Sequence, residues 1–225
     1  PSYGESEVKL GKALEGARDR VVLATKTLQR RRAPAIEELD RSLRRLKTDR
    51  VDLWQFHSLA SNRDVDQIVG EDGALQAGRE AVKAGKVRFL GVTGHADPRV
   101  FVEALRRHAF DALLIPLNCI DPHHLSFQTI ALPFARERGA GVVAMKVYCS
   151  GRLPSRSIVE ADDCLRYTYG LPISTCTVGC STVPQVELAA RVARDPRPLS
   201  DGARAALLER TRRHSPDLEW YKARR

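Results

Sequence analysis

The stretch Val51-Asp52-Leu53-Trp54-Gln55-Phe56-His57 decides the fold class. Its apolar, β-prone residues predict a buried strand that ends in a polar side chain, His57. Residues 34–47 before it carry leucine and isoleucine at helical spacing, and the earlier apolar run 21–26 ends in Lys26. A strand, a helix and a strand in this order predict a βαβ unit with Lys26 and His57 at one rim.

The remaining chain repeats this alternation of strands and helices. Residues 61–66 are polar and residues 150–157 are rich in glycine, proline and serine, so both are predicted to be loops. Six strands separated by helices, without a hairpin signal, predict a parallel sheet covered by helices. Further strands are expected over 88–93, 112–118, 141–147 and 175–180, and further helices over 6–14, 74–84, 98–108, 129–138, 161–169, 184–193 and 200–213.

Polar side chains stand at or just after the end of each predicted strand: Lys26, His57, Thr93, Asn118, Lys146 and Ser181. A (β/α)8 barrel brings such strand ends into one ring, where its active sites form. An open doubly wound sheet usually carries a glycine-rich turn, and neither GxGxxG nor GxxxxGKS/T is present. The sequence therefore predicts an α/β fold, a (β/α)8 TIM barrel in a single domain over residues 1–225, although six strands are two short of eight.

Composition argues against several classes of function. The hydrophobic fraction is 43%, no apolar run approaches the roughly 18 residues of a membrane helix, and no secretory signal opens the chain. We therefore expect a cytoplasmic protein without a membrane partner. The net charge of +9 gathers toward the two ends, and aromatic residues make up only 6%, a pattern that argues against nucleic acid. The densest basic run, residues 30–32, would form a rim that attracts an anionic cofactor.

Cysteine and histidine usage predicts no metal site. The five cysteines are odd in number and scattered, so reduced and mostly buried thiols are expected. The adjacent His123 and His124 would point apart, and no acid stands at ligand spacing from them. They are interpreted as loop residues.

Four segments together resemble the aldo-keto reductase family, in the order of that family and over nearly the whole chain. They are Tyr3-Gly4-Glu5-Ser6-Glu7 followed by Leu10-Gly11-Lys12-Ala13-Leu14, then Ala24-Thr25-Lys26, then Asp52-Leu53-Trp54-Gln55-Phe56-His57, and then residues 85–93. The resemblance implies an eight-stranded barrel that uses NADPH or NADH to reduce aldehyde or ketone groups of small molecules. It also implies that the chain begins inside the second βα unit, without the first strand, the first helix and the second strand.

The resemblance implies three catalytic residues. Tyr3 matches the tyrosine that donates a proton, Lys26 the lysine that lowers the pKa of that tyrosine, and His57 the histidine beside the substrate carbonyl. These residue types suit the chemistry, because hydride arriving at a carbonyl carbon leaves charge on oxygen that a nearby acid must neutralise. A tyrosine with a pKa of about 10 is a poor donor until a cation lies beside it. The family also has an aspartate five residues before this tyrosine, a position that precedes Pro1.

The resemblance implies a cofactor site as well. Thr93 and Asn118 match positions that hydrogen-bond the nicotinamide carboxamide, and residues 178–187 match the segment that binds phosphate and adenine. In that segment Gly179, Cys180 and Ser181 lead into a helix N-terminus suited to phosphate, and Gln185 and Glu187 would face the adenosine.

Two departures from the family pattern leave details open. The family commonly has an aromatic residue against the nicotinamide, where this chain has Met145 and Lys146. Its basic residue for the ribose 2′-phosphate would fall near Thr182, so NADP is expected and NAD stays open.

Two other functions remain as alternatives. A Schiff-base lyase or aldolase on the same fold could use Lys26 or Lys146, since desolvated lysines at barrel strand ends serve that role. A catalytically silent, nucleotide-binding barrel would account for the departures. The carbonyl substrate and the oligomeric state are not indicated by the sequence.

Overall fold

The computed structural model of the chain describes residues 1–222. Within them six strands form one sheet in the order β1-β2-β3-β4-β5-β6, which is also their order along the chain. The pairs β1–β2, β2–β3 and β5–β6 are parallel. The strands are Ala24–Thr27 (β1), Val51–Phe56 (β2), Val87–Thr93 (β3), Ala112–Pro116 (β4), Gly141–Met145 (β5) and Thr175–Cys176 (β6).

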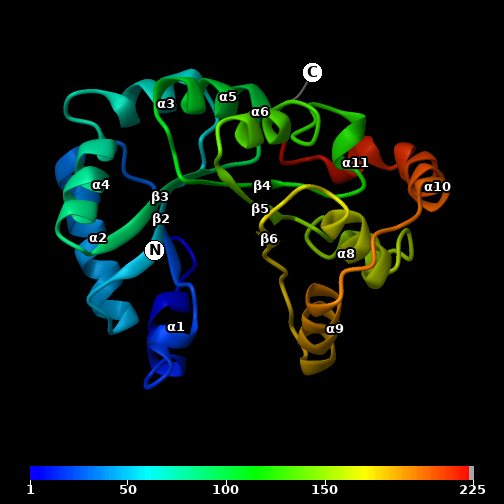
Figure 1. The fold of residues 1–225 in the computed structure, drawn as a ribbon, viewed down its shortest axis with the longest axis horizontal. Coiled ribbons are helices and arrows are strands. Elements are labelled where there is room, and N and C mark those ends of the chain that lie inside the picture. The colour runs from blue at the N-terminus through cyan, green and yellow to red at the C-terminus, as the bar shows by residue number, and fades with distance from the viewer. Residues whose placement is uncertain (223–225) are drawn as a thin grey trace. The chain divides into compact units, whose positions relative to one another are not determined.

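Helices lie between successive strands along the chain (Figure 1). Parallel neighbouring strands need such crossover connections, which are usually helical. The predicted α/β class with a parallel sheet is thereby confirmed. The helices are Ser6–Ala13 (α1), Arg32–Leu46 (α2), Asn62–Val69 (α3), Ala74–Lys83 (α4), Pro98–Arg107 (α5), Ala131–Glu137 (α6), Arg152–Ser155 (α7), Ala161–Tyr169 (α8), Val183–Arg194 (α9), Asp201–Arg212 (α10) and Ser215–Leu218 (α11), with short 3₁₀ turns at Arg18–Arg20 and Asp121–His123.

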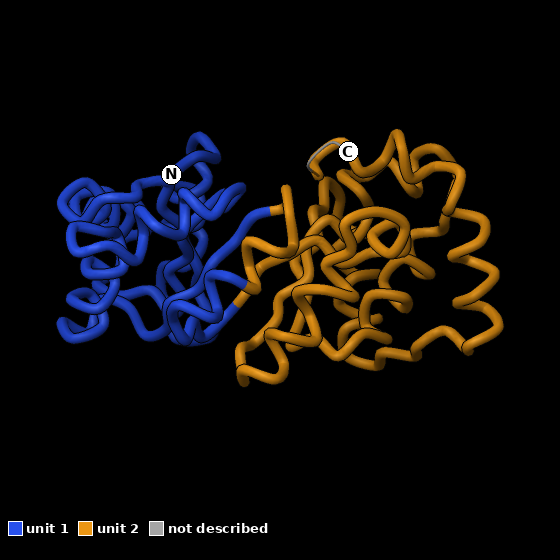
Figure 2. Tube along the Cα trace, turned by 90° about the horizontal axis from the view of Figure 1, so that it is seen from above, with its two compact units in different colours: residues 1–94, 103–112 blue, residues 95–102, 113–225 orange. Residues whose placement is uncertain are grey.

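The chain divides into two compact units, drawn in different colours in Figure 2. Unit 1 consists of Pro1–Gly94 and Glu103–Ala112, and unit 2 of His95–Val102 and Leu113–Arg225. Strands β1, β2 and β3 belong to unit 1, and β5 and β6 belong to unit 2. That the whole chain forms a single barrel domain stays a prediction.

Strand β2 forms the centre of unit 1 because β1 and β3 pair with it on either side. The Phe56 side chain is fully buried, with its ring 5.7 Å from that of Trp54 and 5.9 Å from that of Phe110. On β3, a Cβ atom added to Gly91 would lie 2.7 Å from the carbonyl oxygen of Ala112, so only glycine fits this close approach. The stretch that predicts the fold class thus contributes Val51, Trp54 and Phe56 to the core of unit 1.

Asp52 links the start of β2 to the segment before β1 through hydrogen bonds. Its Oδ2 accepts hydrogen bonds from the Leu23 N–H at 2.8 Å and from the Arg18 guanidinium at 2.9 Å. Burial alone would raise the pKa of the Asp52 carboxyl. The two hydrogen-bond donors lower that pKa by more than burial raises it, so it lies below its usual value.

Asp52→Asn should therefore destabilise the protein at neutral pH by about 1–2 kcal/mol, because the Arg18 cation loses its counter-charge. A carboxyl with a depressed folded pKa contributes stability above its unfolded pKa of about 3.9 and loses that contribution as the pH falls through the folded pKa. The difference in unfolding free energy between wild type and variant should be full at pH 7 and shrink in acid. Denaturant titrations at several pH values measure it, and a pH-independent difference would contradict the assignment.

Several predicted boundaries are wrong, each for a local reason. The predicted loop 61–66 is mostly helix α3, because its polar residues Ser61 and Asp64 form a capping box at the helix start. The predicted loop 150–157 contains the short helix α7. The strand expected over 21–26 begins only at Ala24, and the Val22 side chain before it is 82% exposed.

The last strand is also shorter than predicted. Only Thr175 and Cys176 of the expected strand 175–180 pair regularly with β5, and the Thr177 N–H adds one more bond, 2.8 Å to the Ala144 carbonyl. The chain then leaves the sheet toward α9, which begins at Val183.

The cysteines all lie in unit 2 as free thiols, with Cys119, Cys149 and Cys164 buried and Cys176 and Cys180 partly exposed, as expected for reduced thiols. Over residues 1–222 no cluster of three or more His, Cys, Asp or Glu side chains could hold a metal ion. None of the helices in this range combines the length and the apolar character that crossing a membrane demands.

Candidate functional site

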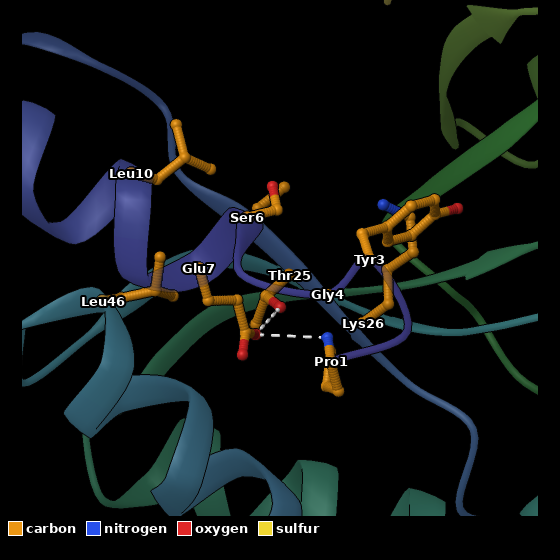
Figure 3. A pocket seen from close by; sticks show the side chains of 10 residues that line it. Pro1, Tyr3, Gly4, Ser6, Glu7, Leu10, Thr25, Lys26 and Leu46 are labelled. Carbon is orange, nitrogen blue, oxygen red and sulfur yellow. Dashed lines mark hydrogen bonds and ion pairs between the residues drawn. The ribbon is translucent and has the colours of Figure 1, made fainter.

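Tyr3, Lys26 and His57 lie close together in unit 1. The Tyr3 hydroxyl lies 3.4 Å from His57 Nε2, and the two rings are stacked with centroids 5.9 Å apart. The Lys26 ammonium lies 5.4 Å from the centroid of the Tyr3 ring, and Figure 3 shows the two side chains next to each other. Three residues that are distant in sequence therefore form one cluster of a phenol, an imidazole and an ammonium.

The supporting elements explain how the cluster forms. Tyr3 lies in the turn before α1, Lys26 is on β1, and His57 directly follows β2. Strands β1 and β2 are parallel neighbours, and the Lys26 Cα is in register with that of Gln55. Parallel pairing of the two strands thus brings Lys26 and His57 to the same end of the sheet.

Burial lowers the pKa of Lys26 below its usual value. Within residues 1–222 no carboxylate and no hydrogen-bond acceptor contributes to the shift; desolvation is its cause. The Lys26 ammonium is thus a poorly solvated cation that lies beside the Tyr3 ring. The Tyr3 side chain itself is 61% exposed, so its hydroxyl is open to a ligand.

A small cavity of about 140 Å³ lies beside Tyr3 and Lys26, and Glu7 and Thr25 line it as well (Figure 3). The buried Glu7 carboxylate accepts a 2.7 Å hydrogen bond from the Thr25 hydroxyl. This bond ties α1 to β1 and fixes the turn that carries Tyr3 next to Lys26. Glu7 is a positioning residue that the sequence reasoning left without a role, although it ends the quoted segment Tyr3–Glu7.

Arg30 supports His57 from the backbone side. Its guanidinium donates a 2.8 Å hydrogen bond to the His57 carbonyl oxygen and pairs with Asp64 at 3.0 Å. Its neighbours also bind acids, Arg31 to Asp72 and Arg32 to Glu80. All three arginines of the basic run 30–32 thus pair with acids of unit 1. That this run forms a rim attracting an anionic cofactor stays a prediction.

Thr93 ends β3 in unit 1 and is buried. Its carbonyl oxygen accepts a 3.0 Å hydrogen bond from the Leu59 N–H, which holds the chain just after His57. The Thr93 carbonyl oxygen is thus already engaged in a backbone hydrogen bond.

In unit 2, Asn118 follows β4 and is also buried. Its amide nitrogen donates to the Lys146 carbonyl at 2.9 Å and to the Tyr221 hydroxyl at 3.3 Å, and its amide oxygen accepts from the backbone of Ile120 and Asp121.

Lys146 follows Met145, the last residue of β5, and burial lowers the pKa of Lys146. The Lys146 ammonium lies 5.2 Å from the ring centroids of both Trp220 and Tyr221. Aromatic rings thus do lie near Lys146, but they come from the C-terminal part of the chain.

The predicted phosphate segment lies at the start of α9 in unit 2. Gly179 has open space where a side chain would stand, and the first turn of α9 carries no acid. Gln185 Oε1 accepts a 2.7 Å hydrogen bond from the Ser181 N–H, while Cys180 Sγ donates to the Val178 carbonyl at 3.8 Å. Ser181, Gln185 and Glu187 are exposed, so this helix start can accept an anion.

Comparison with known proteins identifies the family. Residues 1–165 match the model of the "Aldo/keto reductase family". The chain belongs to the aldo-keto reductase family. The predicted resemblance to this family is thereby confirmed.

Curated aldo-keto reductase relatives include the "Aldo-keto reductase YhdN" of Bacillus subtilis (strain 168), which is 30% identical over 174 residues, covering 70% of this chain and 48% of the relative. The "6-dehydroglucose reductase" of Novosphingobium aromaticivorans is 28% identical over 189 residues, covering 75% of this chain and 59% of the relative. The chain thus spans about half the length of the curated relatives it matches.

Solved aldo-keto reductases share the fold. The holo form of AKR11C1 from Bacillus halodurans has a TM-score of 0.73 at 23% identity, covering 91% of this chain and 77% of that structure. An aldo/keto reductase from Klebsiella pneumoniae, solved with NADP and acetate, has a TM-score of 0.68 at 23% identity, covering 93% of this chain and 75% of that structure.

Proposed function

We propose that the protein is an NADP-dependent oxidoreductase that reduces aldehyde or ketone groups of small molecules, with Tyr3 as the proton donor. The observation that carries this proposal is the Tyr3 hydroxyl, 3.4 Å from His57 Nε2 and beside the Lys26 ammonium. Membership of the aldo-keto reductase family and the NADP in the Klebsiella pneumoniae structure support it.

Each residue of the cluster has a defined task in this reaction. NADPH, when bound, supplies a hydride to the carbonyl carbon. Tyr3 gives its hydroxyl proton to the carbonyl oxygen, so the substrate gains a hydride and a proton, two hydrogen atoms in all, and leaves as an alcohol. Lys26 favours this transfer because its cation stabilises the tyrosinate left behind. His57 Nε2 orients the hydroxyl by hydrogen bonding.

The reaction is tested by mixing the protein with NADPH and a panel of small aldehydes and ketones and following the loss of NADPH absorbance. Turnover that requires both the protein and a carbonyl compound is expected. Cofactor binding without turnover on any member of the panel would favour the catalytically silent barrel instead.

The residues of unit 2 fit a dinucleotide at the start of α9. Gly179, with open space where a side chain would stand, and the N-terminus of α9 offer backbone donors to a phosphate, and the exposed Ser181 offers its hydroxyl. Asn118 of unit 2 is proposed to contact the nicotinamide end. The family's basic residue for the ribose 2′-phosphate would fall near Thr182, which is uncharged. We therefore expect NADP to be used with only a modest preference over NAD.

Ser181→Glu should weaken NADPH binding, because a carboxylate at this position repels the phosphate that the helix start attracts. The expected loss is about 1–3 kcal/mol, or roughly 5-fold to 150-fold in Kd, if the phosphate is contacted directly. NADPH fluorescence titration measures the Kd. Ser155→Glu at the end of α7 is the matched control and should leave the Kd unchanged; equal affinities of wild type and Ser181→Glu would contradict the assignment.

A Schiff-base lyase or aldolase is the second candidate, favoured by the burial that lowers the pKa of Lys26 and of Lys146. Treatment with borohydride in the presence of a carbonyl substrate would then trap a covalent adduct, which mass spectrometry detects on one of these lysines. The reductase proposal predicts no adduct.

A further inference from the structure

The segment Ser215–Lys222, which we call the C-terminal strap, is packed within unit 2, where its Tyr221 contacts Asn118, the residue of this unit assigned to the nicotinamide end of the cofactor. It consists of the short helix α11 and four residues after it (Figure 1). We propose that the strap is a latch: its Tyr221 occupies Asn118, and the strap must release Asn118 before NADPH can bind there. This inference rests on the proposed function, since that function gives Asn118 its ligand.

Asn118 has no hydrogen-bonding capacity to spare in the latched state. Its two amide hydrogens go to the Lys146 carbonyl at 2.9 Å and to the Tyr221 hydroxyl at 3.3 Å. Its amide oxygen accepts two backbone N–H groups, from Ile120 at 2.9 Å and from Asp121 at 3.0 Å. Because an amide side chain offers two donors and one oxygen with two lone pairs, a carboxamide ligand has to displace one of these partners.

Tyr221 is the partner that can be exchanged. The other three bonds of Asn118 go to backbone groups that shape the chain after β4 and β5, whereas the bond to Tyr221 is the longest of the four and joins two side chains. A ligand that replaces the Tyr221 hydroxyl therefore leaves the backbone of unit 2 intact.

The strap is nevertheless well anchored, so release carries a cost. The Lys222 ammonium is fully buried and donates to Asp121 Oδ1 at 2.8 Å, and it also pairs with Glu219. Tyr221 is 5% exposed, its carbonyl lies 3.2 Å from His95 Nδ1, and the Lys146 ammonium lies over its ring. The apparent affinity for a ligand that needs the released state is lowered by the fraction of molecules in which the strap is docked.

Tyr221→Phe tests the latch directly. The variant keeps the ring and loses the bond to Asn118, so the docked state weakens and NADPH should bind about 3-fold to 10-fold more tightly in a fluorescence titration. Tyr167→Phe is the matched control: it removes another buried tyrosine hydroxyl of unit 2, bonded to Gln128 at 2.8 Å, and should leave the Kd unchanged. Lys222→Met, which removes the anchor, should also raise the affinity, and its thermal unfolding shows whether the fold persists.

Hydrogen exchange of the wild-type protein gives a second measurement that needs no variant. Addition of NADPH should increase exchange at the amides of residues 215–222 while it protects the start of α9. Increased protection of the strap, or an unchanged or weaker affinity of Tyr221→Phe, would overturn the latch even though the cofactor binds. Absence of NADPH binding in wild type and all variants would overturn the proposed function, and the latch with it.

Discussion

Tyr3→Phe is expected to reduce carbonyl turnover with NADPH by about 100-fold to 10,000-fold, the range that a positioned general acid contributes. The phenyl ring can still stack on His57 and lie beside Lys26, so the geometry persists and only the transferable proton is lost. NADPH affinity should remain unchanged, because Tyr3 acts on the substrate oxygen. A loss in kcat and kcat/KM of equal size would mark an interaction made in the transition state.

Steady-state kinetics and an NADPH titration on the same preparation check this expectation. Tyr169→Phe, a tyrosine of α8 that belongs to no part of the proposed site, is the matched control and should keep wild-type kinetics. Full activity of Tyr3→Phe would remove Tyr3 from the mechanism.

Lys26→Met should change activity and stability in opposite directions. Turnover should fall by about 100-fold or more, because the cation that stabilises the tyrosinate is gone. The free energy of unfolding at neutral pH should rise by about 0.5–2 kcal/mol, as is common when a strained functional group is replaced by an apolar one. The cause is that the half-buried Lys26 has no carboxylate partner in the described part of the chain.

The pH dependence of this stability difference has a definite sign. Burial lowers the folded pKa of Lys26, so above that pKa the unfolded chain binds more protons than the folded one, up to the ordinary lysine pKa of about 10.4. The free energy of unfolding of the wild type, relative to that of Lys26→Met, should therefore increase as the pH rises from the folded pKa of Lys26 toward about 10.4. Urea titrations from pH 7 to alkaline values measure the gain. A variant less stable than wild type at pH 7 would show that Lys26 has a stabilising partner.

The sequence allowed the regular parts of the fold to be predicted because they carry strong local patterns. Val51–Phe56 has the apolar run of a buried strand, and α2 has leucines at helical spacing that become its buried face. Helix α3 could not be seen as helix, because Ser61 and Asp64 are typical of loops and of helix caps alike. The paired arginines at 30–32 show a similar limit: their acidic partners lie at Asp64, Asp72 and Glu80, far along the chain.

The candidate site was only partly visible in the sequence. Tyr3, Lys26 and His57 could be identified because each stands in a recognisable motif, Lys26 and His57 at strand ends and Tyr3 just before a helix. The engagement of Asn118 by Tyr221 could not, since these residues are 103 positions apart and no local pattern links them. Long-range side-chain contacts of this kind depend on how unit 2 packs, and the structure is needed to find them.

The central claim is that hydride and proton reach a carbonyl group at the Tyr3–Lys26–His57 cluster. It is tested most directly by incubating the protein with NADPH deuterated at the hydride position of the nicotinamide and a small aldehyde, and by measuring the isotope content of the alcohol by mass spectrometry. We expect deuterium on the former carbonyl carbon with the wild-type protein and almost none with Tyr3→Phe. Binding of the labelled cofactor without any transfer of deuterium, across a panel of aldehydes and ketones, would contradict the claim.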